Sequence, residues 1–214
     1  MTISNSIVLH GIPWATYECL VDTIDSPGTR LTYDNGDLEI MPPTPNHEEP
    51  IRALNTLVEI ITAEWNWDTT SLGASTIRLP EALRGFEPDS CYHLVNVAHL
   101  PSTETLNLAV NPPDLAVEVN LTIPSLKKLP MYAQVGVREL WRFTPIGGGL
   151  TLFVLSGSTY EEREASIVLA PLTREIVRTL LAERFTLGRA AWTRRLRAWA
   201  QENAPQRNQE ALSS

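Results

Sequence analysis

The sequence has little cysteine and no hydrophobic run of membrane-spanning length. Its two cysteines, Cys19 and Cys91, are too few for a disulfide framework and have no metal-ligand spacing, so we interpret them as buried thiols in a reducing compartment. A membrane-crossing helix needs about 20 consecutive apolar residues. The start of the chain also lacks the basic and apolar regions of a signal peptide. We therefore expect a cytoplasmic protein with no membrane segment.

Basic residues are also in deficit. The chain has 17 Lys and Arg against 25 Asp and Glu, which gives a net charge of −8. Such a charge argues against nonspecific coating of nucleic acid, although it leaves room for a local basic groove. The sequence contains no P-loop, dinucleotide-binding fingerprint, nucleophile elbow or zinc-ligand spacing, so the enzyme classes that depend on those motifs are not indicated.

What is present predicts one globular domain over residues 1–214, with a mixed α/β fold. Hydrophobic residues make up 43% and charged residues 20% of the 214 positions, enough for a substantial core. Apolar residues at spacings of three and four predict a long helix over residues 48–65. Weaker patterns predict helices over residues 14–21, 125–134, 173–184 and 187–202. The polar tail, 203–214, is expected to fray.

Strands are expected between these helices. An Asn-Gly turn predicts a hairpin of residues 30–33 and 37–41, and a second hairpin is expected from 150–155 and 159–161. Single strands are expected within 69–79 and over 89–95, 115–119 and 137–143. We expect a loosely ordered start over 1–12, a proline-rich loop over 41–50 and a turn over 85–88.

Two carboxylates fall in expected strands. Asp89 follows a proline at the start of one strand, and Glu118 interrupts the apolar run of the next. Mg²⁺ binds carboxylate oxygens and keeps several waters, so two acids on neighbouring strands can suffice. Such a metal polarises a phosphoryl oxygen and activates water, and a nearby lysine offsets developing charge. Acids at strand ends are common, however, so this spacing alone favours a surface role.

A string of short motifs is more specific. In order, they are Gly36 to Pro43 with His47-Glu48, then Pro88-Asp89, then Pro113 to Val119, then Lys128 four residues before Tyr132, then Gly136 to Trp141. Over roughly residues 14–185, this order resembles the Uma2 family of restriction endonucleases, within the PD-(D/E)XK nuclease superfamily.

The resemblance implies a restriction-endonuclease-like core, a mixed sheet flanked by helices with an N-terminal hairpin and C-terminal helices. It implies hydrolysis of phosphodiesters in DNA with Mg²⁺ or Mn²⁺ as cofactor. Asp89 and Glu118 match the metal-binding acids. Lys128 matches the catalytic lysine, which in this type of relative lies on the following helix. Related nucleases often pair, which implies a homodimer, and an oligomeric scaffold is a further alternative.

Two positions depart from the family pattern. Members often carry aspartate where this chain has Asn120 and Lys127. The loss of an acid at Asn120 removes a metal contact or water acceptor, and Lys127 beside Lys128 adds positive charge for nucleic-acid binding. A catalytically degenerate module that kept the fold therefore stays open as the alternative.

The start of the long helix carries the remaining candidates. In the family, a histidine and an acid lie there, which matches His47 and Glu48. Glu48 is either an outer metal ligand or, as is more common, a first-turn acid that stabilises the helix N-terminus. His47 is expected to be a loop or capping residue rather than a ligand, and Asp114 a turn residue.

Overall fold

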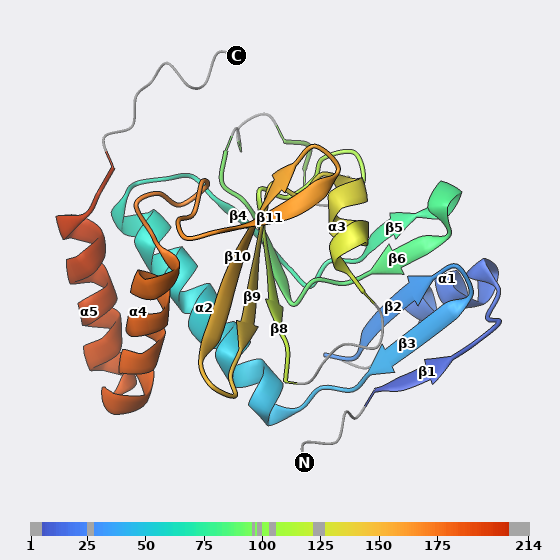
Figure 1. The fold of residues 1–214 in the computed structure, drawn as a ribbon, viewed down its shortest axis with the longest axis horizontal. Helices are drawn as coiled ribbons and strands as arrows, with labels where there is room; N and C mark the ends of the chain where they lie inside the picture. The colour runs from blue at the N-terminus through green and yellow to red at the C-terminus, as the bar shows by residue number, and fades with distance from the viewer. Residues whose placement is uncertain are drawn as a thin grey trace.

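The computed structural model describes residues 6–24, 28–95, 97, 100–102, 106–121 and 127–205. Within them the chain forms a six-stranded sheet and a five-stranded sheet, with helices around the larger one (Figure 1). This is the mixed α/β fold that the sequence predicts. In the described part of the chain, no helix is both long and apolar enough to cross a membrane.

The larger sheet has the strand order β11-β10-β9-β8-β7-β4. Its strands, in chain order, are β4 (Thr70–Gly73), β7 (Ser90–His93), β8 (Leu115–Val119), β9 (Glu139–Thr144), β10 (Gly149–Ser156) and β11 (Thr159–Arg163). β8 and β9 are parallel, while β8 is antiparallel to β7, so the sheet is mixed. The parallel pair is joined by a helical crossover, as parallel strands require.

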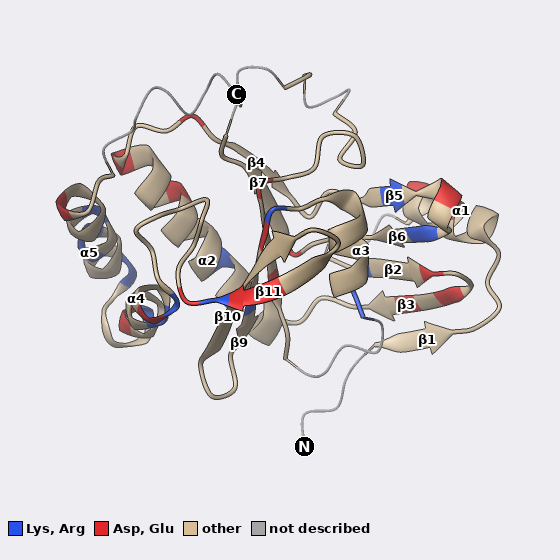
Figure 2. Cartoon of the chain, turned by 45° about the horizontal axis from the view of Figure 1, so that its top comes forward, with Lys and Arg blue, Asp and Glu red and all other residues tan. Residues whose placement is uncertain are grey.

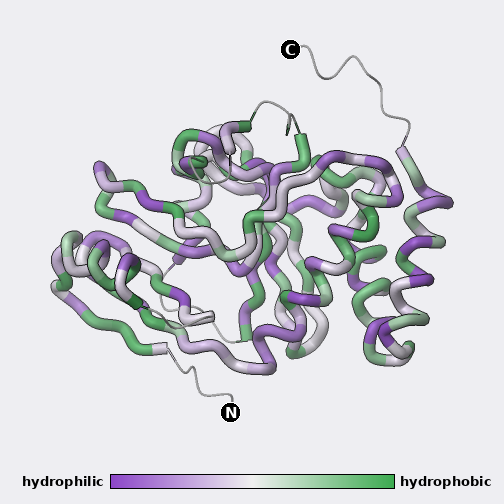
Figure 3. The backbone as a smooth tube through the Cα atoms, turned by 180° about the vertical axis from the view of Figure 1, so that it is seen from behind, coloured by the Kyte–Doolittle hydropathy of each residue, from purple (hydrophilic) through white to green (hydrophobic). Residues whose placement is uncertain are grey.

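Helices cover both faces of this sheet. One face packs against α2 (Pro45–Glu64), α4 (Arg174–Thr186) and α5 (Arg189–Glu202), and the other against α3 (Leu129–Val135) (Figure 1). Successive side chains of a strand point to opposite faces of the sheet, so the side chains of β8 are divided between these two faces. Leu115, Val117 and Val119 enter the core with α2, whereas Ala116 enters the core with α3. Figure 3 shows hydrophobic residues along the central strands and mostly hydrophilic colouring along outlying α5.

The smaller sheet lies on the α3 side (Figure 1) and has the order β1-β3-β2-β6-β5. Its strands are β1 (Ile7–Leu9), β2 (Arg30–Asp34), β3 (Asp37–Met41), β5 (Ile77–Leu79) and β6 (Arg84–Phe86). A short 3₁₀ turn, Pro80–Ala82, joins β5 to β6. Helix α1 (Trp14–Thr23) packs its Tyr17 on Tyr33 of β2, with the rings stacked 5.1 Å apart.

Four local expectations are wrong. Cys19, expected to be a buried thiol, is exposed on α1. β1 forms where a loosely ordered start was expected, because it pairs with β3. β6 replaces the turn expected over 85–88. Position 85 of this strand requires glycine, because a Cβ atom there would collide with Tyr17. Glycine within a strand often marks such a close approach. Finally, α2 begins at Pro45 inside the expected loop, since proline is well tolerated in the first helical turn.

Candidate active site

Strand register brings the two acids together. β7 and β8 pair antiparallel, with Cys91 opposite Ala116 and Ser90 opposite Val117. Continuing this register places Asp89 opposite Glu118. Both then lie on the face shared by Cys91 and Ala116, towards α3. The backbone N–H of Val119 donates to Asp89 Oδ2 at 2.7 Å, which anchors the aspartate to the neighbouring strand.

Glu118 is an acid inside a fully buried strand, with 6% of the residue exposed. Two donors from the start of α3 compensate for its burial. Lys128 Nζ donates to Glu118 Oε1 at 3.0 Å and to Oε2 at 3.3 Å, and the Tyr132 hydroxyl donates to Oε1. Lys128 and Tyr132 are four residues apart, so they lie on one face of this helical turn. Lys128 also donates to the backbone carbonyl of Glu87 at 3.0 Å.

Burial and charge act against each other on this pair. Burial raises the pKa of Glu118, and the negative charge of Asp89 raises it further. Lys128 lowers this pKa, but the net result is a pKa above the usual value. Burial lowers the pKa of Lys128, but Glu118 and Asp89 outweigh it and the pKa is raised. The lysine therefore stays cationic and forms an ion pair with Glu118.

The first turn of α2 completes the centre. His47, expected in a loop or cap, lies inside α2 with 5% exposed. Its Nε2 donates to the carbonyl of Val119 at 2.9 Å and lies 3.2 Å from Asp89 Oδ2. Burial lowers the pKa of His47, yet Asp89 raises it more. Burial likewise raises the pKa of Asp89, but His47 and Lys128 outweigh it and the pKa is lowered. Asp89 therefore favours the imidazolium form of His47, and His47 favours the ionised form of Asp89.

The other predicted site residues lie less centrally. Glu48 occupies the first turn of α2, with Oε1 3.7 Å from His47 Nδ1. Asn120 directly follows β8 and its N–H donates to the carbonyl of Phe143 at 2.8 Å. Lys127 is exposed, and Figure 2 shows the Lys127-Lys128 pair as the blue segment that leads into α3.

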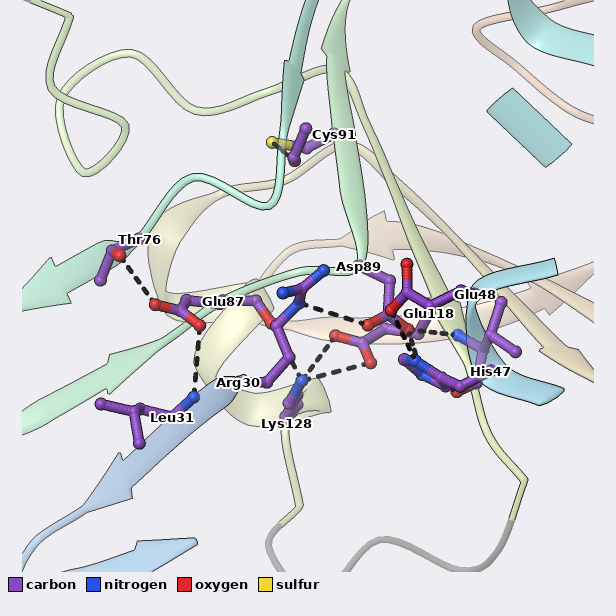
Figure 4. A network of polar contacts seen from close by, with 12 residues as sticks. Arg30, Leu31, His47, Glu48, Thr76, Glu87, Asp89, Cys91, Glu118 and Lys128 are labelled. Atoms are coloured by element: carbon purple, nitrogen blue, oxygen red, sulfur yellow. Dashed lines mark hydrogen bonds and ion pairs between the residues drawn. The ribbon is translucent and has the colours of Figure 1, made fainter. Parts of the chain in front are cut away.

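Three residues that the sequence did not single out for the site also belong to this network, and Figure 4 shows two of them, Arg30 and Glu87. Arg30 of β2 has its Nε 3.8 Å from Asp89 Oδ1. Glu87 accepts from the N–H of Leu31 at 3.2 Å, and Tyr132 binds Glu118 as described. The only available signal was the spacing of Tyr132 from Lys128. Arg30 and Glu87 come together with the acids through tertiary packing, which leaves no local pattern.

The donor set fits a hard divalent cation. In the described part of the chain, histidine, cysteine, aspartate and glutamate side chains form no ready-made group of three or more metal ligands. However, Asp89 Oδ1 and Glu48 Oε1 are buried oxygens that lack a hydrogen-bond partner among the described residues. Since Mg²⁺ and similar ions retain several waters, Asp89 and Glu118 with an outer Glu48 match their preference for oxygen ligands.

Comparisons with known proteins concern the family and the fold. The family model Uma2, described as "Putative restriction endonuclease", matches residues 14–187. A solved structure described as a putative nuclease belonging to DUF820, from Anabaena variabilis, has a similar fold with a TM-score of 0.53. It is 14% identical and the alignment covers 79% of this chain and 99% of that one. At this identity the likeness concerns the fold alone. No curated protein matches the chain.

Proposed function

Because the chain belongs to the Uma2 family, we propose that it is a divalent-metal-dependent endonuclease that hydrolyses phosphodiester bonds in DNA. The observation that carries this proposal is the placement of Asp89 opposite Glu118 across β7 and β8, with Lys128 bound to Glu118. Asp89 and Glu118 would hold Mg²⁺ or Mn²⁺. When bound, that ion supplies a Lewis acid and lowers the pKa of a coordinated water.

The side chains perform the remaining tasks. In hydrolysis, a water oxygen bonds to phosphorus, the bond to the leaving sugar oxygen breaks, and that oxygen takes up the proton that the water gives up. Lys128 remains cationic against Glu118, where its ammonium offsets the negative charge that develops on the phosphoryl oxygens. Tyr132 fixes the Glu118 carboxylate, and His47 together with the Val119 N–H fixes Asp89.

A second candidate is a catalytically degenerate nuclease fold that binds nucleic acid or a protein partner. It is favoured by the contacts of both acids with basic side chains, Glu118 with Lys128 and Asp89 with His47. Such a charge-paired cluster can serve structure alone. Asn120, in place of an acid, favours the same alternative.

A cleavage assay distinguishes the two candidates. Single- and double-stranded DNA are incubated with the protein and Mg²⁺, Mn²⁺ or a chelator, alongside Glu118→Ala. The matched control is Glu162→Ala, which removes an exposed acid on β11. We expect metal-dependent cleavage by the wild type and the control and none by Glu118→Ala. Unchanged cleavage by Glu118→Ala would refute the assignment. No cleavage by the wild type, together with no Mn²⁺ binding, would support the degenerate module.

We also propose that the protein pairs as a homodimer, as related nucleases often do. The β10–β11 hairpin supports this assembly, because β11 lies at the edge of the larger sheet with mostly exposed side chains. Light scattering at high protein concentration tests it, and a monomer there would remove the proposal.

A further inference from the structure

Three basic side chains of the described residues converge on Asp89 and Glu118 (Figure 4). Two of them, Lys128 and His47, are hydrogen-bonded within the site. Arg30 differs from both. Its Nε lies 3.8 Å from Asp89 Oδ1, beyond hydrogen-bond distance, and neither atom has a hydrogen-bond partner among the described residues. The Arg30 side chain is nevertheless only 12% exposed.

The position of Arg30 is set by its surroundings. It begins β2, where it pairs with Met41 of β3. The next residue, Leu31, donates its N–H to Glu87 Oε2 at 3.2 Å, and Thr76 donates to Glu87 Oε1 at 3.0 Å. The backbone carbonyl of Glu87 in turn accepts from Lys128. Glu87 therefore ties the strand that carries Arg30 to the catalytic side of α3.

A buried guanidinium N–H without an acceptor is unfavourable, because no hydrogen bond compensates for the free energy of its desolvation. The fold holds Arg30 in this state although Asp89 is close by. Arginine is always charged, and its planar fork matches phosphate oxygens. A phosphodiester that approaches this site meets the carboxylates of Asp89 and Glu118, whose repulsion must be offset. Lys128 is hydrogen-bonded to Glu118 and His47 lies against Asp89, whereas the Arg30 Nε–H has no hydrogen-bond partner among the described residues.

We propose that Arg30 binds a non-bridging oxygen of the scissile phosphodiester, next to Asp89. This proposal rests on the proposed nuclease function and adds a residue from the smaller sheet to the site. The guanidinium would stabilise the charge on the phosphoryl oxygens as the water attacks, so its effect would fall mainly on kcat.

The test compares Arg30→Gln and Arg30→Lys with Arg84→Gln. Arg84 lies on neighbouring β6, paired with Asp34 at 2.8 Å and outside the acid cluster. The substrates are a duplex oligonucleotide and bis(p-nitrophenyl) phosphate, both with Mn²⁺. We expect Arg30→Gln to lower kcat by about 10²-fold, as loss of one transition-state donor does. Arg30→Lys should recover part of it, and Arg84→Gln should match the wild type. Mn²⁺ affinity without substrate should not be weakened in any variant.

Two outcomes would overturn the proposal in an active enzyme. One is cleavage by Arg30→Gln as fast as by Arg84→Gln. The other is loss of Mn²⁺ binding in Arg30→Gln, because Arg30 would then act by shaping the acid pair rather than by contacting substrate.

If the wild type cleaves neither substrate, the proposed nuclease function is refuted, and the role of Arg30 is tested by DNA binding instead. Fluorescence anisotropy with the labelled duplex and Mn²⁺ measures the affinity of each variant for DNA. A loss of affinity of about tenfold or more in Arg30→Gln relative to Arg84→Gln, as expected for one charge-assisted hydrogen bond, would keep Arg30 as a phosphodiester-binding residue. Equal affinities, or no binding by the wild type, would overturn it.

Discussion

Replacing Lys128 by methionine would leave the Glu118 carboxylate buried without its cation. The Lys128 side chain is 12% exposed and that of Glu118 is 8% exposed, so water screens the pair little. Removal of one partner of a buried ion pair costs about 3–5 kcal/mol. With a urea m-value of about 3 kcal/mol per M, we expect the urea midpoint of Lys128→Met to fall by about 1–2 M.

The loss should depend on pH in a defined direction. Burial already holds the pKa of Glu118 above its usual value, and removal of Lys128 would raise it further. Between the unfolded and folded pKa values the native state binds more protons, so the stability of the variant falls as the pH rises. In the wild type, Lys128 stabilises the carboxylate throughout this pH range. Its pKa is raised, so the ammonium loses its charge only in strong alkali. The deficit should therefore be larger at pH 8 than at pH 5.

Urea unfolding in a chelator, followed by circular dichroism at both pH values, measures this. Lys127→Met is the matched control, because Lys127 is the adjacent lysine and is exposed. Tyr132→Phe removes one hydrogen bond to the carboxylate and should cost less, about 1–3 kcal/mol. The double variant Glu118→Gln/Lys128→Met should regain most of the loss. A deficit no larger than that of Lys127→Met, or equal at both pH values, would refute the reasoning.

Two further predictions concern His47 and Gly28. Burial lowers the pKa of His47 but Asp89 raises it more, so its stabilisation is full below its ordinary value of about 6.5 and lost as the pH rises through the raised folded pKa. In thermal melts, the deficit of His47→Gln should therefore shrink from pH 6 to pH 9, and a constant deficit would contradict this. Gly28 has φ +85° and an added Cβ would lie 2.9 Å from Pro43 Cβ, so Gly28→Ala should cost about 1–3 kcal/mol. Gly157→Ala, with φ +62° and open space, should cost less, and equal losses would remove the steric argument.

The parts of the fold that depend on local pattern could be predicted from the sequence. The five-residue strand β8 and the hairpin of β2 and β3 occupy the expected positions, since their apolar runs and turn residues act within a few positions. The apolar stripe of α2 likewise predicted its buried face. Placement of β4 and β5 in different sheets could not be predicted, because strand pairing depends on residues far apart in the chain.

The site divides in the same way. Asp89, Glu118 and Lys128 could be proposed because they belong to short motifs, and strand pairing then explains how the two acids meet. Arg30 lies 59 positions from Asp89 in sequence numbering and reaches it only because the smaller sheet packs on the α3 side. His47 was misplaced because the prolines around it indicate a loop, whereas Pro45 begins the helix. In both cases tertiary packing outweighed the local signal.

The register between β7 and β8 has a consequence for how the chain tolerates insertions. The spacing of Asp89 and Glu118 is set by the pairing of β7 with β8. Asp114 closes the neck of the connection from His93 to Leu115, since its Oδ2 accepts from the N–H groups of Leu94 and Val95 at 2.8 and 2.9 Å. Loop closure costs rise only slowly with length. Segments grafted beyond this neck should therefore leave the acid pair in place, which makes the connection a natural point for added modules.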